Sequence, residues 1–211
     1  MNKQIFTFFS LAILWTLMGC STKLIKLQDS ELRVVNREIS SIDKATNSIA
    51  LNDKQGDGLA IIEEIDFEVG TLEIDLKGED IRGKSFVGIA FNIQNDSTYE
   101  AIYFRPFNFQ AKEKIRREHS VQYISHPKHN WRFLRTNNEG QFEAEFGRQP
   151  APADWFKVEI KVEKESVIVY DKVTDKELLA VKRLAKPTSK KIGLWMGNNS
   201  KGGFRNLRIK Q

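Results

Sequence analysis

The segment FKVEIKV, residues 156–162, decides the fold of this chain. Its apolar side chains at 156, 158, 160 and 162 alternate with Lys157, Glu159 and Lys161. A period of two is typical of a β-strand that has one buried face and one solvated face. The same alternation is found in TLEIDL, residues 71–76, and in FVGIAFNI, residues 86–93, where both faces carry apolar or small residues. These segments predict antiparallel β-structure.

Outward from these segments, the chain carries further short apolar runs at near-regular spacing. They predict strands at 47–51, 58–62, 99–105, 121–124, 166–170, 177–181, 191–196 and 204–209. Turn-forming pairs such as Asp57-Gly58, Asn95-Asp96 and Gly202-Gly203 separate them. No segment has the pattern of an amphipathic helix of three turns. The chain is therefore predicted to be all-β, an antiparallel β-sandwich.

The N-terminal residues predict an exported lipoprotein. Lys3 precedes an apolar run over residues 5–17, which ends in Leu17-Met18-Gly19-Cys20. Such a box places a thiol directly after a cleavage site, where a diacylglycerol is attached. The alternative, a transmembrane anchor, needs roughly 20 apolar residues. We therefore expect a signal peptide over 1–19, a tether over 20–30 and one domain over 31–211.

Cys20 is the single cysteine of the chain, which excludes internal disulfides and fits a thiol that carries lipid. We expect localisation in the cell envelope, with Cys20 anchored in the outer membrane and the domain facing the periplasm or the exterior. The net charge of +5 is mild. Its densest basic group, around Arg116 and Arg117, is interpreted as a solvated loop. Nucleic acid is therefore not expected as a partner.

Two long connections interrupt the regular strand spacing, Pro106–Ser120 and Ser125–Asp154. Long loops in a compact β-domain are uncommon unless they bind something or remain disordered. The aromatic residues in both connections favour order. We therefore expect the functional residues to lie there.

Several of these segments carry a resemblance to a known superfamily. They are FEVGTLEIDLKG (67–78), FVGIAFNIQNDSTYEAIYFRPFNF (86–109), VQYISHPKHNW (121–131), Asp154-Trp155-Phe156 and IGLWMGNNSKGGFRNL (192–207). Together they resemble the concanavalin A-like lectin/glucanase superfamily, in particular bacterial lipoproteins near the 3-keto-disaccharide hydrolase domain and the laminin G-like jelly rolls. The resemblance covers nearly all of the chain after Cys20. It implies a jelly-roll sandwich with one curved sheet facing a glycan, in an enzyme or a binding module.

Glu64, Asp66 and Glu68 match the Glu-x-Asp-x-Glu motif of family 16 glycoside hydrolases. In that motif the outer carboxylates act as nucleophile and acid/base, about 5 Å apart. Here the motif directly precedes the strand at 71–76, whereas in the enzymes it lies later. The simpler interpretation is an acidic segment that leads into a strand. These three acids and His126 are the weak catalytic candidates, and the catalytic residues stay undetermined.

Aromatic and planar polar side chains around the long connections are the candidate carbohydrate-binding residues. Sugars stack on aromatic rings, and arginine and amide groups bind adjacent hydroxyls. Alternatives remain open: Arg105 pairs with an internal carboxylate, His126 is structural, Trp195 is core, and only one of Gln122 and Tyr123 faces outward. The candidates are Tyr103, Arg105, Asn108, Gln122, Tyr123, His126 and Trp131.

His126 and His129 lack obvious further ligands for a metal site, so no metal is expected beyond a possible structural calcium. Three functions remain. The first is a carbohydrate-binding lipoprotein, whose partners are a glycan and, through Cys20, a membrane. The second is a glycoside hydrolase, either family 16-like or 3-keto-disaccharide hydrolase-like. The third is an envelope scaffold that binds protein.

Overall fold

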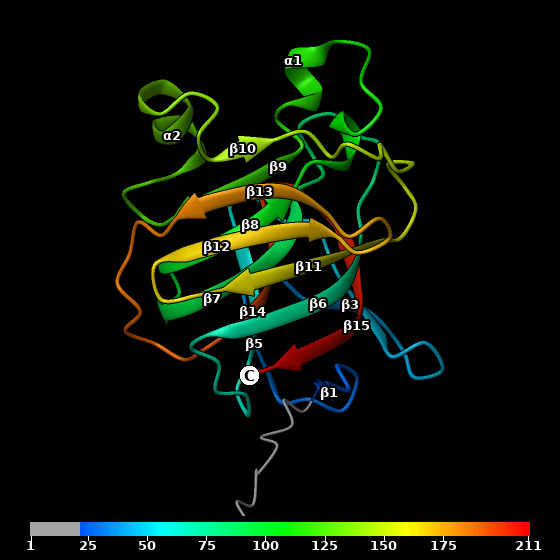
Figure 1. Ribbon diagram of the computed structural model, residues 1–211. Coiled ribbons are helices and arrows are strands. Elements are labelled where there is room, and N and C mark those ends of the chain that lie inside the picture. Colours follow the sequence, from blue (N-terminus) through cyan, green and yellow to red (C-terminus); the bar gives the residue numbers. More distant parts are fainter. Residues whose placement is uncertain (1–21) are drawn as a thin grey trace, which may run out of the picture.

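The structure is a computed structural model that describes residues 22–211, and its strands form two antiparallel sheets packed face to face (Figure 1). The first sheet has the order β13-β12-β11-β6-β15-β4-β3, with β1 paired to β15. The second has the order β10-β9-β8-β7-β14-β5-β2. Prediction of an all-β antiparallel sandwich is confirmed.

The strands of the two sheets have the following bounds. The first sheet contains β1 (Thr22–Leu24), β3 (Ile39–Asp43), β4 (Ser48–Leu51), β6 (Gly70–Lys77), β11 (Phe156–Val162), β12 (Ser166–Asp171), β13 (Lys176–Lys182) and β15 (Gly202–Lys210). The second contains β2 (Leu32–Val35), β5 (Gly58–Ile62), β7 (Val87–Asn95), β8 (Thr98–Phe104), β9 (Val121–Ser125), β10 (Glu143–Ala144) and β14 (Gly193–Met196).

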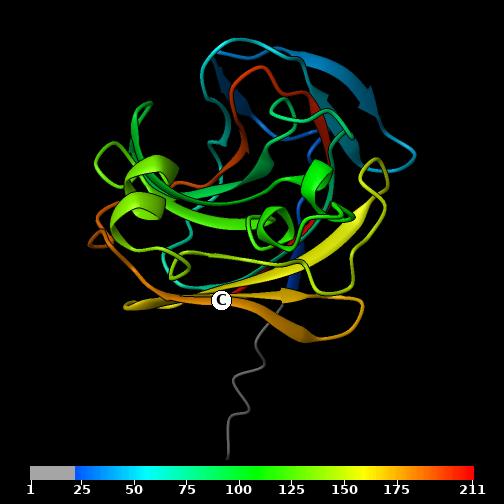
Figure 2. The same ribbon diagram turned by 90° about the horizontal axis from the view of Figure 1, so that it is seen from above.

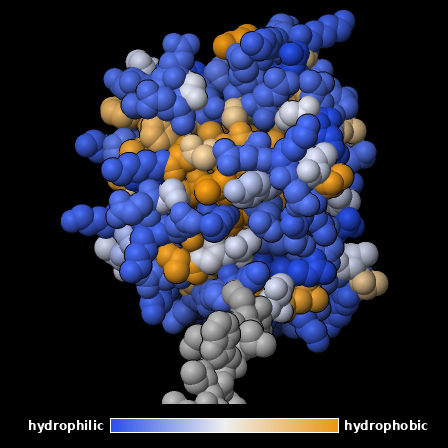
Figure 3. Space-filling model, in the orientation of Figure 1, coloured by the Kyte–Doolittle hydropathy of each residue, from blue (hydrophilic) through white to orange (hydrophobic). Residues whose placement is uncertain are grey.

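The alternation in β11 produces the layering. Val158 and Ile160 are fully buried between the sheets, whereas Lys161 faces solvent. Hydrophilic residues cover most of the face seen in Figure 3, with an apolar patch near its centre. At one end of the core Phe104 of β8 meets Phe156 of β11 at a ring-centroid distance of 5.2 Å. Burial of these apolar side chains from both sheets holds the sandwich together.

A buried ion pair also joins the two sheets. Glu100 of β8 accepts hydrogen bonds from the guanidinium of Arg183, which directly follows β13 of the opposite sheet. The Asn92 amide and the Tyr123 hydroxyl donate to the same carboxylate at 2.8 and 2.6 Å. Both carboxylate oxygens of Glu100 therefore accept hydrogen bonds from side chains in the interior.

Each strand predicted from the sequence is present near its expected position, but β1, β2, β3 and β10 were not predicted. All five residues of β3 are exposed, because this strand lies at the edge of its sheet. A strand without a buried face leaves no alternation to read. All four missed strands pair with only one neighbouring strand.

The predicted tether over 20–30 is wrong for residues 22–30. Thr22–Leu24 pair with Arg208–Lys210 of β15, and Ile25 and Leu27 are buried in the core. Residues 22–30 therefore belong to the folded domain, which was predicted to begin at residue 31. The predicted signal peptide, residues 1–19, and the predicted lipid site at Cys20 lie outside the described residues.

Both long connections are ordered and contain short helices. The first folds into η1 (Pro106–Asn108) and α1 (Lys114–Arg117), and the second contains α2 (Trp131–Asn137). Asn130 caps α2 by accepting a hydrogen bond from the Phe133 amide at 3.0 Å, which satisfies a free donor of the first turn. The helices α1 and α2 lie at the opposite end of the molecule from β1 (Figure 1). Over residues 22–211, no helix has the length and apolarity needed to span a bilayer.

Candidate functional site

The outer face of the second sheet carries a row of side chains that points away from the core. Directly opposed residues of antiparallel strands share a face. The register therefore aligns one residue from each of six strands: Leu59, Trp195, Gly88, Tyr103, Gln122 and Glu143. Figure 2 shows the two sheets from above, from the end at which α1 and α2 lie.

Gly88 lets the strands approach closely in the middle of this row. A Cβ at this position would lie 2.1 Å from the Ile102 carbonyl oxygen and 2.6 Å from Tyr103 Cα. Trp195 and Tyr103, which pair with Gly88 from either side, bring their ring centroids to 4.7 Å with an interplanar angle of 31°. The two rings form an aromatic floor on the sheet.

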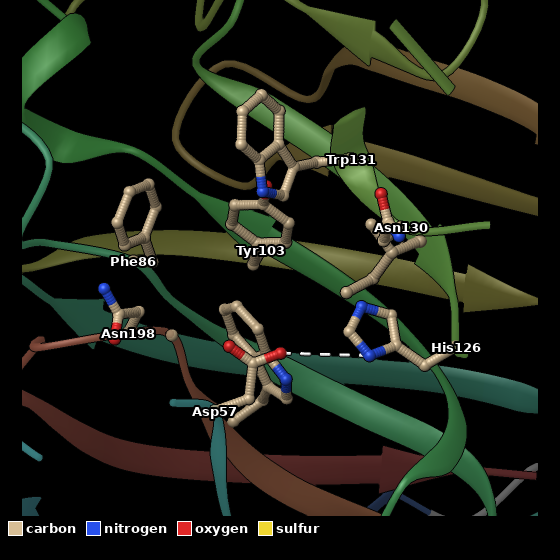
Figure 4. Close-up of a pocket in the computed structure, with 10 residues that line it drawn as sticks. Asp57, Phe86, Tyr103, His126, Asn130, Trp131 and Asn198 are labelled. Atoms are coloured by element: carbon tan, nitrogen blue, oxygen red, sulfur yellow. Dashed lines mark ion pairs between the residues drawn. The ribbon is translucent and has the colours of Figure 1, made fainter. Parts of the chain in front are cut away.

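A pocket of about 150 Å³ lies above this floor (Figure 4). Trp131, the first residue of α2, is 41% exposed and lies at its rim. Asp57 and Asn198 come from the loops before β5 and after β14. The pocket is lined by Asp57, Phe86, Tyr103, Ile124, His126, Asn130, Trp131, Trp195, Gly197 and Asn198.

A chain of polar contacts runs through the pocket. The Trp195 indole donates to the Tyr99 hydroxyl at 3.1 Å, and that hydroxyl donates to Asp57 Oδ2 at 3.3 Å. His126 stacks on Tyr99 with ring centroids 5.1 Å apart, and its Nδ1 lies 3.8 Å from the same Asp57 oxygen. Its other ring nitrogen lies on the side of Asn130 (Figure 4). Asp57 and His126 therefore form a close acid–imidazole pair.

Burial acts on both members of this pair. It raises the pKa of Asp57 and lowers the pKa of His126, and the attraction between the two charges opposes each shift. Burial also raises the pKa of Tyr103 to about 12, so its hydroxyl stays protonated at neutral pH. The neutral forms of these groups offer both donors and acceptors of hydrogen bonds.

Arg37 fixes the loops that carry Asp57 and Asn198. Its guanidinium is buried and donates to the carbonyl oxygens of Gly56 and Gly197, at 2.7 Å each. The Gly56 amide in turn donates to Asn198 Oδ1 at 2.8 Å. The polar rim of the pocket is thereby held in place from behind.

A second, larger hollow of about 510 Å³ adjoins the pocket. Arg105 lies in its wall, almost fully buried, and donates to the His119 carbonyl at 2.7 Å, to the Tyr103 hydroxyl and to Gln122 Oε1 at 3.2 Å. These acceptors are neutral, so the alternative that Arg105 pairs with an internal carboxylate is wrong. Asn108 contacts the same carbonyl and accepts from Arg116 Nε, at 3.4 Å each.

The structure brings most of the predicted binding residues together. Tyr103, His126 and Trp131 line the pocket, and Arg105 and Asn108 line the adjoining hollow. Gln122 is buried on the same face and supports Arg105. Tyr123 is misassigned, because its ring lies in the core and its hydroxyl donates to buried Glu100.

The acidic motif does not belong to this site. Glu64, Asp66 and Glu68 are exposed in the connection between β5 and β6, whereas Asp57 precedes the other end of β5. The motif is not on a strand, so its three carboxylates do not project from one strand face as the enzyme mechanism requires. These three acids line neither the pocket nor the hollow, and a catalytic role for them stays a prediction.

Sequence reasoning missed Asp57, Phe86 and Asn130 in the pocket, and Arg82, His119 and Arg135 in the hollow. The only signal at residue 57 was the turn pair Asp57-Gly58. Asn198 and Trp195, which are not among the predicted binding residues, also line the pocket. Among residues 22–211, no group of three or more His, Cys, Asp or Glu side chains is placed to hold a metal ion. These residues therefore give no support to the structural calcium that the sequence left open.

The sheet order and the curved sheet carrying the cleft define a β-sandwich of the galectin-like and concanavalin A-like lectin fold. The chain is similar to the carbohydrate-binding module CBM66 from Bacillus subtilis, with a TM-score of 0.54 and 12% identity, covering 90% of this chain and 97% of that one. It is also similar to a Bacillus subtilis protein of unknown function with a galectin-like fold (TM-score 0.55, 12% identity, 88% and 90% coverage).

A third similar structure is the metal-free exoplasmic/lumenal domain of VIP36, with a TM-score of 0.58, 11% identity and coverage of 90% and 91%. No protein-family model and no curated protein matches the sequence. At these identities the likeness establishes the fold alone. The expected concanavalin A-like architecture agrees with it, while the narrower resemblance to 3-keto-disaccharide hydrolase and laminin G-like domains stays a prediction.

Proposed function

We propose that this chain binds a carbohydrate in the pocket on the outer face of its second sheet. The observation that carries the proposal is the exposed indole of Trp131 at the rim of a pocket floored by Tyr103 and Trp195. The C–H faces of a sugar pack on aromatic rings, while its hydroxyls need polar groups around them. Asp57 and Asn198 supply such groups at the rim.

Unused hydrogen-bonding capacity supports the same function. Asp57 Oδ2 is occupied by Tyr99 and His126, whereas Asp57 Oδ1 and Asn198 Nδ2 have no hydrogen-bond partner within residues 22–211. The pocket volume of about 150 Å³ is smaller than the roughly 300–1,000 Å³ typical of drug-sized ligands. We therefore expect one sugar unit to fill the pocket and its neighbours to extend into the adjoining hollow.

The similar structures support a glycan ligand through their own ligands. CBM66 is a carbohydrate-binding module, and the VIP36 domain has been solved with Ca²⁺ and Man3GlcNAc bound. In those proteins the same sandwich architecture serves glycan recognition. The pocket of this chain offers aromatic rings and polar groups to such a ligand, and residues 22–211 contain no cluster of side chains placed to hold a metal ion.

A glycan array followed by calorimetry with a binding glycan tests the proposal. Trp131→Ala is expected to weaken binding about fivefold or more, because truncation of an aromatic anchor costs more than about 1 kcal/mol. Trp155→Ala is the matched control, since Trp155 lies against Gly203 on the first sheet with Arg205 over its ring at 4.4 Å. Absence of binding to any glycan, or equal affinity in the wild type and Trp131→Ala, contradicts the proposal.

A second candidate function is cleavage of a glycoside, and the Asp57–His126 pair favours it. A carboxyl group and an imidazole 3.8 Å apart, with pKa values that burial shifts in opposite directions, can donate and accept a proton at one substrate. Release of reducing sugar from a glycan that binds, abolished by Asp57→Asn while affinity is retained, is the result expected of an enzyme. Binding without product release leaves the chain as a binding module, and loss of all glycan binding favours the scaffold that binds protein.

We further propose that the chain is exported and anchored by lipid on Cys20 in the cell envelope. The box Leu17-Met18-Gly19-Cys20 supports this. Because β1 lies at the opposite end from α2, an anchor before β1 leaves the Trp131 end directed away from the membrane (Figure 1). Metabolic labelling with a fatty acid is expected to mark the wild type and not Cys20→Ser, which is expected in the soluble fraction; labelling of both contradicts the proposal.

A further inference from the structure

The aromatic pocket and the larger hollow form one continuous cleft. Phe86, Trp131 and Asn198 line both of them. A ligand with one sugar unit over Tyr103 therefore places its next groups against the wall of the larger hollow. That wall consequently selects what the neighbouring groups can be.

Arginine dominates this wall. Arg82, Arg105, Arg116 and Arg135 line the hollow together with His119, and no carboxylate belongs to its lining. Basic side chains concentrated in a concave surface focus a positive potential on whatever enters. An extended neutral sugar would leave this potential unused.

Nearby acids offset only part of the charge. Arg135 is paired with Glu143, its Nη2 lying 2.6 Å from Glu143 Oε2, and Arg116 lies 3.4 Å from an exposed Glu113 oxygen. Arg82 and Arg105 have no ion pair in residues 22–211. These two cations therefore have no carboxylate in direct contact, and Glu113 and Glu143 act on them only from a greater distance.

Of these two residues, Arg105 is the stronger evidence for an anionic ligand, because it is almost fully buried. Its neutral acceptors orient the guanidinium but do not neutralise it. Burying a charge is costly unless an opposite charge accompanies it, and burial accordingly lowers the pKa of Arg105. An anionic group in the cleft would supply the missing partner.

We infer that the ligand of this cleft is an acidic glycan whose carboxylate or sulfate lies against Arg105, Arg116 and Arg82, with an adjoining sugar ring in the aromatic pocket. The inference rests on the proposed carbohydrate binding and narrows it to a charged substrate class. Arginine suits this task because its planar fork matches the paired oxygens of carboxylate and sulfate.

Pairs of polymers that share a backbone and differ only in charge test the inference. Suitable pairs are polygalacturonate with its full methyl ester, alginate with its propylene glycol ester, and a sulfated galactan with its desulfated form. The purified full-length chain is expected to bind the charged member of at least one pair about tenfold more tightly. The affected pair tells carboxylate from sulfate. Raising NaCl from about 0.05 to about 0.5 M should weaken that binding.

Outcomes separate this inference from the proposed function. The inference of an acidic ligand is overturned if the neutral member of every pair binds as tightly as the charged member or more tightly, or if only other neutral glycans bind. The proposed carbohydrate binding remains in either case. Failure to bind any glycan overturns both. Each result is therefore decisive for at least one of the two proposals.

Variants distinguish a built site from general attraction to a basic protein. Arg82→Gln and Arg116→Gln are each expected to weaken binding of the charged polymer about threefold to tenfold. Arg105→Lys is expected to weaken it about 10-fold to 100-fold, because lysine lacks the planar guanidinium that binds two oxygens at once. Arg208→Gln removes one charge from β15 of the first sheet and is the matched control, expected within about twofold of wild type. Equal losses in Arg82→Gln and Arg208→Gln overturn the inference. Unchanged thermal stability of Arg82→Gln excludes a folding defect.

Discussion

Replacing Glu100 by glutamine is expected to destabilise the sandwich severely. The side chain is fully buried on the inner face of β8 and accepts hydrogen bonds from Asn92, Tyr123 and Arg183. The Arg183 side chain is itself only 2% exposed. Glu100→Gln keeps the size of the side chain but removes its charge, so Arg183 is left as a buried cation without its counter-ion.

The magnitude follows from that isolated charge. Breaking a buried ion pair by removing one partner costs about 3–5 kcal/mol. Typical domains have a free energy of unfolding of only about 5–15 kcal/mol, so the loss is a large fraction of the total. At about 2–4 °C per kcal/mol for a chain of this size, the Tm is expected to fall by roughly 6–20 °C.

Urea and thermal unfolding followed by circular dichroism measure the effect. Glu159→Gln is the matched control: Glu159 pairs with Lys172 at 3.3 Å, with side chains 28% and 30% exposed, and its loss should cost less than about 1 kcal/mol. A loss below about 1 kcal/mol for Glu100→Gln, or one equal to the control, refutes the reasoning. Glycan affinity of the folded variant should not change, because Glu100 lies on the inner face of the sheet.

Three further perturbations probe the site and its support. Tyr123→Phe removes a hydrogen-bond donor to buried Glu100 and is expected to lower the free energy of unfolding in urea by about 1–3 kcal/mol. Calorimetry is expected to show unchanged glycan affinity. A loss of affinity in the folded variant would mean that Tyr123 belongs to the binding site. Gly88→Ala places a Cβ against backbone and should lower stability by about 1–3 kcal/mol or more, so an unchanged Tm argues against the close strand contact. Burial lowers the pKa of His126 below 6.5, so the unfolded chain takes up its proton first and stability falls as the pH drops through 6.5 toward the folded-state pKa. His126→Gln should reduce the fall in unfolding free energy between about pH 7.5 and about pH 5.5, since the other two histidines remain in both proteins; an equal fall contradicts the assignment.

The residues of the sequence alone determined the fold class and part of the site. Alternation in residues 156–162 and 71–76 is a local property, because successive side chains of a strand point to opposite faces whatever the partner strand is. Tyr103 and Trp131 were found because long connections in a compact β-domain usually carry function and because sugars stack on aromatic rings. The expectation that these connections bear the site agrees with the position of the cleft.

Tertiary structure alone decided which polar groups meet. Asp57 and His126 lie far apart in the chain and come within 3.8 Å because β5 and β9 belong to one sheet. Alternation placed Gln122 and Tyr123 on opposite faces, but only the register against β8 shows that Tyr123 is the one facing the core. The period of two is encoded in each strand, whereas the order and register of strands depend on contacts between distant segments, which no single segment of the sequence contains.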